Sequence, residues 1–433
     1  MNQTQQYLTN TSTSMIHRAP WVIVDVANEV YPDTRGIIED GALVIDEGVI
    51  RAVGKAKAII SEYAGIPVRD HGNRALAAPL INGHCHLELS YMDLAGSKAR
   101  QAAYSNDPTE WIRDLLRARD EFGRDPDGGE KGLHLARQVL DQMNTEGVGF
   151  VGDIGNSLAS RTIGRDKKTK VNFLLELLGL AKESEEHARL RLESVATDPA
   201  IGVSCTAHAP YSTTPGLILE LKRIADRHGS VFSIHVAESQ QEVEFLQKGS
   251  GKFLDFLKER GAWDKSFTVP GVGPVLYLEN LGVLNGNTIC VHAVHVSSEE
   301  IAILASRKAK VCLCPGSNRF LGVGKAPVTE LLDHGILPAL GTDSRASNPF
   351  LSIWREMHLL REDHPSVSPE TVFSMATRGG AEAWGIVSEA GTLDPGKPGR
   401  VISIECGPDC RSGHDLLEYI TTAGGSVQVE WIG

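Results

Sequence analysis

The sequence predicts an α/β protein whose main domain is a (β/α)8 TIM barrel, joined to a small β-sandwich formed by the two ends of the chain. Short apolar runs bounded by Gly or Pro alternate with segments of helical period through the middle of the chain, which is the pattern of βα units. Alternating apolar and polar residues recur near both ends, as in short antiparallel strands. A chain of 433 residues can hold one barrel, which commonly uses about 250 residues, and an accessory unit.

The chain is expected to divide into a tail, a small domain and the barrel. Residues 1–20 are polar and rich in Thr, Gln and Asn, so a flexible N-terminal tail is predicted. Residues 21–78 alternate between turn signals, and the same pattern returns within 390–433. These two segments are predicted to form one small β domain together, in which they could share a sheet. Residues 79–389 are predicted to form the barrel.

The barrel region contains apolar runs that are typical of buried strands and periodic segments that are typical of helices. Predicted strands are 148–153, 202–207, 231–237, 288–292, 310–314 and 337–342, and predicted helices include 111–122, 131–146, 215–227 and 351–361. No Gly-x-Gly-x-x-Gly fingerprint follows these strands, and no Gly-rich loop ends in Lys-Ser or Lys-Thr. The sequence therefore favours a barrel over an open doubly wound sheet and gives no support for a nucleotide cofactor.

Composition and charge exclude several classes of protein. A net charge of -12 disfavours nucleic acid as a partner, because binding to phosphates needs an excess of Lys and Arg. No apolar run approaches the roughly 18 residues of a membrane span, and the start of the chain lacks the pattern of a secretory signal. Seven scattered cysteines fit a reducing compartment. We expect a cytoplasmic protein, and the sequence leaves open whether it is a homodimer.

The strongest local pattern is Asn82-Gly83-His84-Cys85-His86, which follows an apolar run ending at Ile81. Residues two apart on an extended strand share a face, so His84 and His86 can direct two imidazoles at one metal ion. Taken alone, the pair fits two partly exposed loop histidines equally well.

Further polar residues stand near the C-terminal ends of predicted strands, where barrel enzymes carry their catalytic groups. They are His208, His235, Glu238, His292 and Asp343. Each one alone would fit a core or surface role, but their occurrence in series indicates a site. The remaining histidines are interpreted as surface or packing residues, with His295 ambiguous.

Taken together, segments 82–90, 208–212, 235–239, 292–297, 315–318 and 341–348 resemble the amidohydrolase superfamily. The likeness runs roughly from residue 21 to 404 and is greatest to the branch of metal-dependent deaminases and chlorohydrolases. The loop His86-Leu87-Glu88-Leu89-Ser90 is similar to that of aminofutalosine and S-adenosylhomocysteine deaminases. Pro79-Leu80 and Gly399-Arg400 depart from the usual Pro-Gly and Ala-Asp of this branch, outside the expected chemistry.

The resemblance implies a barrel with a small β-sandwich and a metal site. It implies that His84, His86, His235 and Asp343 are the metal ligands. Members with two metals carry a bridging modified lysine on the fourth strand, and the segment 204–208 contains no lysine, so one divalent metal is expected. Three imidazoles and a carboxylate favour Zn²⁺, although Fe²⁺ accepts a similar set.

The resemblance also implies roles for the other residues. Asp343 is expected to take up a proton from the attacking water, Glu238 to carry a proton to the substrate, and His292 to polarise the attacked centre or to hold the hydroxide. Expected substrate-binding residues are His208, Glu238, Trp111, Asp120 and Asn318. Asp120 stands nine residues after Trp111, where relatives grip ribose hydroxyls; a solvated helix face is the alternative.

The leading functional hypothesis is hydrolytic deamination of a purine, an adenosine-type compound or a related small heterocyclic amine, with release of ammonia. A chlorohydrolase or amidohydrolase could use the same site, because the same hydroxide attacks other activated carbons. A third hypothesis is a catalytically inactive barrel that serves as a binding protein. The complete ligand set together with Glu238 argues against this third hypothesis.

Overall fold

The N-terminal boundary of the folded chain lies earlier than predicted. The computed structural model describes residues 14–24, 36–92, 107–158, 161, 163–164, 168–196 and 204–432. Residues 1–13 of the predicted tail lie outside this set. Strand β1 (Met15–Ile23) begins within the predicted tail, because Ile16 and Ala19 are buried in the sheet despite their polar neighbours.

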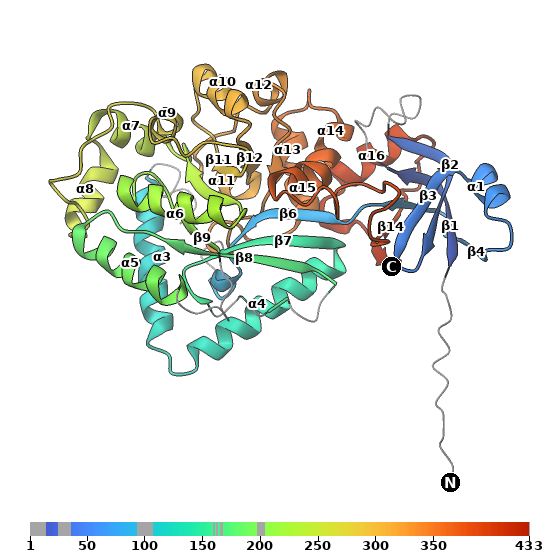
Figure 1. Ribbon diagram of the computed structural model, residues 1–433, viewed down its shortest axis with the longest axis horizontal. Helices are drawn as coiled ribbons and strands as arrows, with labels where there is room; N and C mark the ends of the chain where they lie inside the picture. The colour runs from blue at the N-terminus through green and yellow to red at the C-terminus, as the bar shows by residue number, and fades with distance from the viewer. Residues whose placement is uncertain are drawn as a thin grey trace, which may run out of the picture.

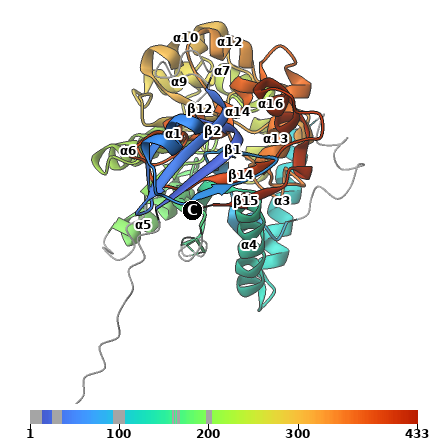
Figure 2. The ribbon, with the colours of Figure 1, turned by 90° about the vertical axis from the view of Figure 1, so that its right-hand side faces the viewer.

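Strands from both ends of the chain share one sheet, which lies at the right of Figure 1 and faces the viewer in Figure 2. Its strands are β1, β2 (Ile37–Asp46), β3 (Val49–Lys55), β4 (Val68–Asp70), β5 (Arg74–Ala77), β14 (Ile402–Glu405) and β15 (Val429–Trp431). The order is β15-β14-β5-β1-β2-β3, and β4 pairs with β1. The described strands of this region make one sheet, and the second sheet that a sandwich requires is not among them.

Different elements cover the two faces of this sheet. Helix α1 (Ala56–Glu62) packs Ala56 and Ile59 against Ile16 and Val44. On the other face, Val22 and Leu43 belong to a cluster with Leu393, which comes from the C-terminal segment. A helix covers one face and irregular chain lies on the other. The described strands therefore do not show the β-sandwich that the family resemblance implied.

The middle of the chain forms two four-stranded parallel sheets. One contains β6 (Leu80–Cys85), β7 (Val148–Gly155), β8 (Lys170–Leu177) and β9 (Ser204–Ala207) in that order, and the other contains β10 (Phe232–Val236), β11 (Thr288–His292), β12 (Lys310–Leu313) and β13 (Ala339–Leu340). A parallel bridge joins Cys85 to Asp343, and the His235 N–H donates to the His208 carbonyl at 2.9 Å. The α/β class with parallel strands is therefore confirmed, and the ends of both sheets come together.

Helices surround these sheets (Figure 1). They are α3 (Pro108–Gly123), α4 (Gly128–Thr145), α5 (Lys182–Ala196), α6 (Pro215–Arg227), α7 (Gln240–Lys248), α8 (Lys252–Glu259), α9 (Pro274–Asn280), α10 (Ser298–Arg307), α11 (Pro315–Leu321), α12 (Val328–Asp333), α13 (Ile353–Asp363), α14 (Pro369–Ser374), α15 (Gly380–Ala383) and α16 (Gly413–Thr422), with short turns η2 (Leu87–Leu89), η5 (Met375–Gly379) and η6 (Gly424–Ser426). Helix α6 has the predicted bounds because Thr214 caps its first turn and Pro215 starts it. In the part of the chain that the structure describes, no helix has both the length and the apolar character of a membrane span.

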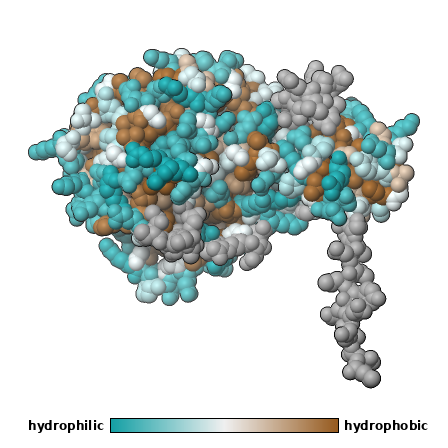
Figure 3. All heavy atoms as spheres, in the orientation of Figure 1, coloured by the Kyte–Doolittle hydropathy of each residue, from teal (hydrophilic) through white to brown (hydrophobic). Residues whose placement is uncertain are grey.

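Hydrophilic and apolar residues are interspersed on the face of the molecule seen in Figure 3. The interior is a large apolar cluster between the sheets and the helices around them, to which Leu140, Leu221 and Trp354 contribute fully buried side chains. This packed layer holds the strands in place and so fixes the polar residues at their ends.

Candidate active site

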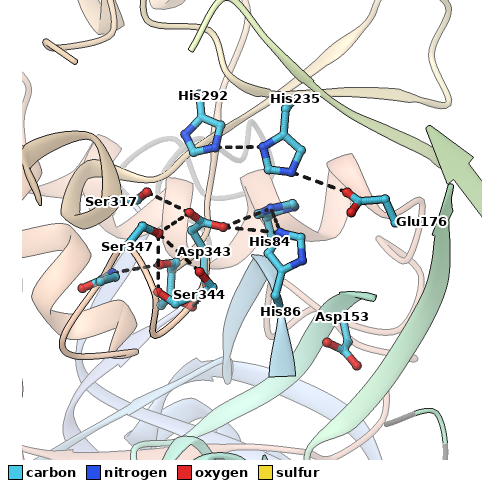
Figure 4. Close-up of polar contacts among 12 residues, drawn as sticks. His84, His86, Asp153, Glu176, His235, His292, Ser317, Asp343, Ser344 and Ser347 are labelled. Carbon is cyan, nitrogen blue, oxygen red and sulfur yellow. Dashed lines mark hydrogen bonds and ion pairs between the residues drawn. The ribbon is translucent and has the colours of Figure 1, made fainter. Parts of the chain in front are cut away.

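The polar side chains predicted from strand ends converge in space (Figure 4). His84 belongs to β6 and His86 follows it, His235 belongs to β10, His292 ends β11, and Asp343 follows β13. These residues are far apart in the sequence, and the two parallel sheets bring them to one place. Such clustering at the C-terminal ends of parallel strands is where α/β enzymes place their active sites.

The group His84, His86 and His235 has the spacing of a metal site, because its ligand atoms lie within 4.8 Å of one another. The Nε2 atoms of His84 and His86 are 3.1 Å apart. Oδ1 of Asp343 lies 3.7 Å from the first of these atoms and 3.4 Å from the second. The three imidazoles therefore form one metal-capable group, and the Asp343 carboxylate lies beside two of its members.

The electrostatics of this group suit a cation. Burial lowers the pKa of His84 to about 4 and holds the pKa of His235 well below its ordinary value, so these two rings are neutral near pH 7. Burial alone raises the pKa of Asp343, but polar contact with His84 and the nearby His86 lower it more, and the pKa lies well below its ordinary value. Neutral imidazoles and an ionised carboxylate are the protonation states that metal binding requires.

The Asp343 side chain is fixed by hydroxyl groups. Ser317 Oγ donates to Asp343 Oδ2 at 2.8 Å, and Ser347 Oγ donates to the same oxygen. The backbone of Asp343 has a φ of 57°, which is unusual for a residue with a side chain. Residues held in this region cluster at functional sites, where the surrounding structure enforces them.

Hydrogen bonds also define the tautomers of two histidines. Nδ1 of His292 lies 2.9 Å from Oδ1 of Asn318, which can only accept, so this nitrogen carries the proton. Nε2 of His292 is then unprotonated and accepts from Nδ1 of His235, 3.1 Å away. Nε2 of His235 is consequently left with a free lone pair, and it has no hydrogen-bond partner in the described residues. A bare, buried ring nitrogen is what a metal ligand needs.

Glu238 lies beside this array without belonging to the three-histidine group. Its Oε1 is 3.6 Å from Nε2 of His292. Burial raises the pKa of Glu238, which makes its carboxyl group more able to carry a proton near neutral pH. Its backbone follows Ala237, which has a φ of 52°.

A cavity of about 350 Å³ is lined by His86, His235, Glu238 and Asp343 of this array. His208 and Glu238 line its polar part, and His208 Nδ1 lies 2.6 Å from Ser212 Oγ. Much of the remaining wall is apolar and includes Trp111, Ile112, Leu115 and Leu116 of α3 together with Phe256 and Leu257. A cavity of this size and character is typical of a small-molecule site.

Two expected substrate-binding residues take other positions. Asp120 is exposed and is not among the residues that line the cavity; Arg119, one position earlier on α3, lines it instead. One residue turns a helix by about 100°, so a match in spacing does not fix which residue faces the site. Asn318 is buried against His292 and is also absent from the cavity wall.

Glu176, the last residue but one of β8, lines the cavity and was not predicted from the sequence. Asn156 and Arg119, also unpredicted, line the cavity beside it. The signal was a single carboxylate in the apolar run Leu174-Leu175-Glu176-Leu177-Leu178. The segment was not among the predicted strands, so its end was not searched for polar residues.

The sequence profile of the amidohydrolase family matches residues 76–422. The chain belongs to the amidohydrolase family. The resemblance inferred from the sequence motifs is therefore confirmed. This amidohydrolase is 27% identical over 385 residues to the 5-methylthioadenosine/S-adenosylhomocysteine deaminase of Nitratidesulfovibrio vulgaris, an alignment that covers 86% of this chain and 80% of the relative.

Solved structures share the fold of this amidohydrolase. Helicobacter pylori aminofutalosine deaminase superposes with a TM-score of 0.77 at 22% identity, covering 96% of this chain and 97% of that chain. Atrazine chlorohydrolase from Arthrobacter aurescens TC1, complexed with zinc, superposes with a TM-score of 0.74 at 20% identity, covering 94% of this chain and 91% of that chain. At these identities the likeness concerns the fold.

Proposed function

We propose that this amidohydrolase is a metal-dependent hydrolytic deaminase of an adenosine-type compound or a related heterocyclic amine. The observation that carries the proposal is the position of Glu238, a buried carboxyl group with a raised pKa. It faces His292 and the cavity beside the three-histidine group without being a member of that group. The deaminase from N. vulgaris, which aligns over most of this chain, supports the same chemistry.

The proposal includes the closure of the two parallel sheets into a (β/α)8 barrel. The Cys85–Asp343 bridge and the backbone hydrogen bond from His235 to His208 support this closure at the two places where the sheets meet. A closed barrel would gather all eight strand ends around one centre. The seven cysteines are all free thiols, six of them buried, which supports a reducing, cytoplasmic location.

His84, His86, His235 and Asp343 would hold one divalent metal ion. The fit rests on the bare Nε2 of His235 and on the ionised carboxylate of Asp343. Zn²⁺ is favoured by this donor set and by the zinc in the related chlorohydrolase, and Fe²⁺ accepts a similar set. When bound, such a metal supplies hydroxide from water at neutral pH.

The residues of the chain would then manage protons and orientation. Asp343 accepts a proton from the attacking water, and Glu238 delivers a proton to the ring nitrogen beside the amino-bearing carbon. His292, held by Asn318, accepts from His235 through Nε2 and so orients that ligand, and His208 contacts the substrate from the adjacent strand end. The water oxygen becomes the new carbonyl oxygen. Its two protons end on the ring nitrogen and on the departing ammonia.

The cavity supports a substrate larger than a bare heterocycle. Its volume of about 350 Å³ lies within the range of about 300–1,000 Å³ that accommodates drug-sized ligands. Trp111 offers an aromatic surface for a flat ring, and its Nε1 is already bonded to the Ala346 carbonyl at 2.9 Å, which fixes that surface. A nucleoside would place its base between the metal ligands and Trp111 of α3.

An ammonia-release screen of the metal-loaded protein tests the proposal. Adenosine-type nucleosides, guanine, cytosine and amino-triazines are the probes, and metal analysis should give near one equivalent. Adenosine-type compounds should release ammonia. Chloride release from chloro-triazines without ammonia release from any amine would instead support a chlorohydrolase, as the related fold of atrazine chlorohydrolase suggests. A metal-free protein that binds heterocycles without turnover would support the binding-protein hypothesis.

A further inference from the structure

Glu176 presents an unsatisfied oxygen atom to the active-site cavity. Its side chain is buried, and the residue is only 3% exposed. Asn156 Nδ2 donates to Oε2 at 2.9 Å, whereas Oε1 has no hydrogen-bond partner in the described residues. A buried polar atom without a partner is unfavourable, because its lost hydration is not replaced. Such an atom is expected where a ligand supplies the missing partner.

The nearest polar side chain does not satisfy this oxygen. Nε2 of His235 lies 3.7 Å from Oε1 of Glu176 (Figure 4). The bond between His292 and His235 places the His235 proton on Nδ1, so its Nε2 has no hydrogen to donate. The acceptor oxygen of Glu176 therefore remains available to a donor that enters the cavity.

Glu176 is also held in place. Arg119 donates to Asn156 Oδ1 at 3.0 Å. Asn156 Nδ2 in turn donates both to Oε2 and to the backbone carbonyl oxygen of Glu176. The Asn156 backbone N–H is bonded to Glu88 at 2.9 Å. This chain of contacts fixes the direction of the free oxygen before a substrate arrives, which lowers the entropic cost of recognition.

We propose that Glu176 accepts a hydrogen bond from the amino group that leaves, and that it thereby selects an amine over a halide. The inference rests on the proposed function. Nδ1 of His235 faces His292, and Glu238 lies beside His292. Nε2 of His235 faces Glu176 instead, so the two carboxyl groups lie on opposite sides of the His235 ring. The reacting edge of a heterocyclic amine has a ring nitrogen on one side of the attacked carbon and the amino group on the other. If Glu238 serves the ring nitrogen, Glu176 faces the amino group.

Burial raises the pKa of Glu176, while His86, the Asn156 hydrogen bond and Arg119 favour the ionised form; it is the ionised carboxylate that gives this contact its selectivity. An amino group donates a hydrogen bond to a carboxylate oxygen, whereas a chlorine substituent has no proton and leaves as an anion. A fixed carboxylate therefore attracts the first leaving group and repels the second. The same array of metal ligands could otherwise serve both reactions, so this residue would separate a deaminase from a chlorohydrolase on a shared fold.

The test compares two substrates that give the same product. Metal-loaded protein is assayed for kcat/KM with adenosine and with its analogue in which chlorine replaces the amino group, or with the matching pair for the best amine in the screen. Glu176→Gln removes the charge and keeps the shape. We expect the amine-to-chloride ratio of kcat/KM to fall at least about tenfold in this variant. Glu176→Asp keeps the charge and should keep the preference for the amine, even with a lower rate.

Two results would overturn the inference. An unchanged amine-to-chloride ratio of kcat/KM in Glu176→Gln would show that Glu176 does not discriminate between the two leaving groups. Loss of metal from that variant would show that Glu176 serves to hold His235. Failure of the proposed function has a different signature, because the wild-type protein itself would then release no ammonia from any amine.

Discussion

Several active-site residues adopt backbone conformations that side chains normally avoid. Ala237, His292 and Asp343 have φ values of 52°, 71° and 57°, each at or just after the end of a parallel strand. A residue in this region costs of order 1–3 kcal/mol and persists only when its surroundings enforce it. Glu238 and Asp343 line the cavity, and His292 is buried beside them, so stability is given up where chemistry is expected.

Replacing Glu238 with Gln should abolish turnover and leave the metal in place. The amide has nearly the same shape but cannot carry a proton, so kcat should fall by about 10²–10⁴-fold. Ammonia release measures the rate, and elemental analysis of the same sample measures the metal. Full activity of Glu238→Gln would remove this residue from the proton-transfer step.

Replacing His235 with Ala should remove the metal as well as the activity. His235 contributes to the group whose ligand atoms lie within 4.8 Å of one another, so its removal should reduce bound metal from one equivalent to a small fraction and abolish activity with it. Elemental analysis after dialysis measures the loss. A variant that retained a full equivalent of metal would contradict the assignment of His235 as a ligand.

At the scale of elements, the turn between β10 and α7 is held by a buried carboxylate. Oε1 of Glu242 accepts from the Ala237 N–H at 3.0 Å, and Oε2 accepts from the Glu238 N–H at 2.9 Å. Ser239 caps the same helix by accepting from the Glu242 N–H. The helix start thus fixes the strained turn that carries Glu238.

Glu242→Gln should lower kcat by about tenfold or more with little change in bound metal. Its amide nitrogen would meet a backbone N–H, donor against donor, and open the turn. Kinetic constants and metal content measure the effect. Glu300→Gln is the matched control, because Glu300 holds the same position in α10 and accepts from Ser297 and Val275. An equal loss of kcat in both variants would mean that Glu242 acts only through stability.

The sequence could predict which histidines converge because each follows a short apolar run. His84, His235 and His292 stand at or near the ends of such runs, and strand ends converge in any parallel sheet. Glu176 could not be found in this way, since β8 went unrecognised. Arg119 and Asn318 depend on which side of a helix faces a neighbour, and that is decided by packing between distant segments.

At the scale of the whole molecule, a buried carboxylate links the ends of two neighbouring strands. Glu356 of α13 accepts from the Gly316 N–H at 2.6 Å and from Asn348 Nδ2 at 2.7 Å. Asn348 also donates to the Thr342 carbonyl at 2.8 Å. These bonds join the start of α11, which carries Ser317, to the loop that carries Asp343, so the state of one carboxyl group influences the geometry of the site.

The free energy of unfolding should depend on pH because of the titration of Glu356. Burial raises the pKa of Glu356 from 4.5 to about 7, so the folded chain keeps a proton that the unfolded chain releases. Its contribution to the free energy of unfolding is full below about pH 4.5 and declines as the pH rises to about 7. The difference in urea stability between wild type and Glu356→Gln should decline over this window. A stability difference that did not change with pH would contradict the prediction. The control is the variant Glu130→Gln at an exposed position, whose stability difference from wild type should not decline over this window.

The small sheet can be completed only after the C-terminal strands have been synthesised. Strand β5 pairs with β14, and Arg74 bonds to Ser403, 329 positions later. While the ribosome is still translating the middle of the gene, the edge of β5 has no neighbour on that side, and a bare strand edge invites pairing with other chains. The nascent polypeptide must therefore keep this edge covered or short-lived until the last part of the message has been read.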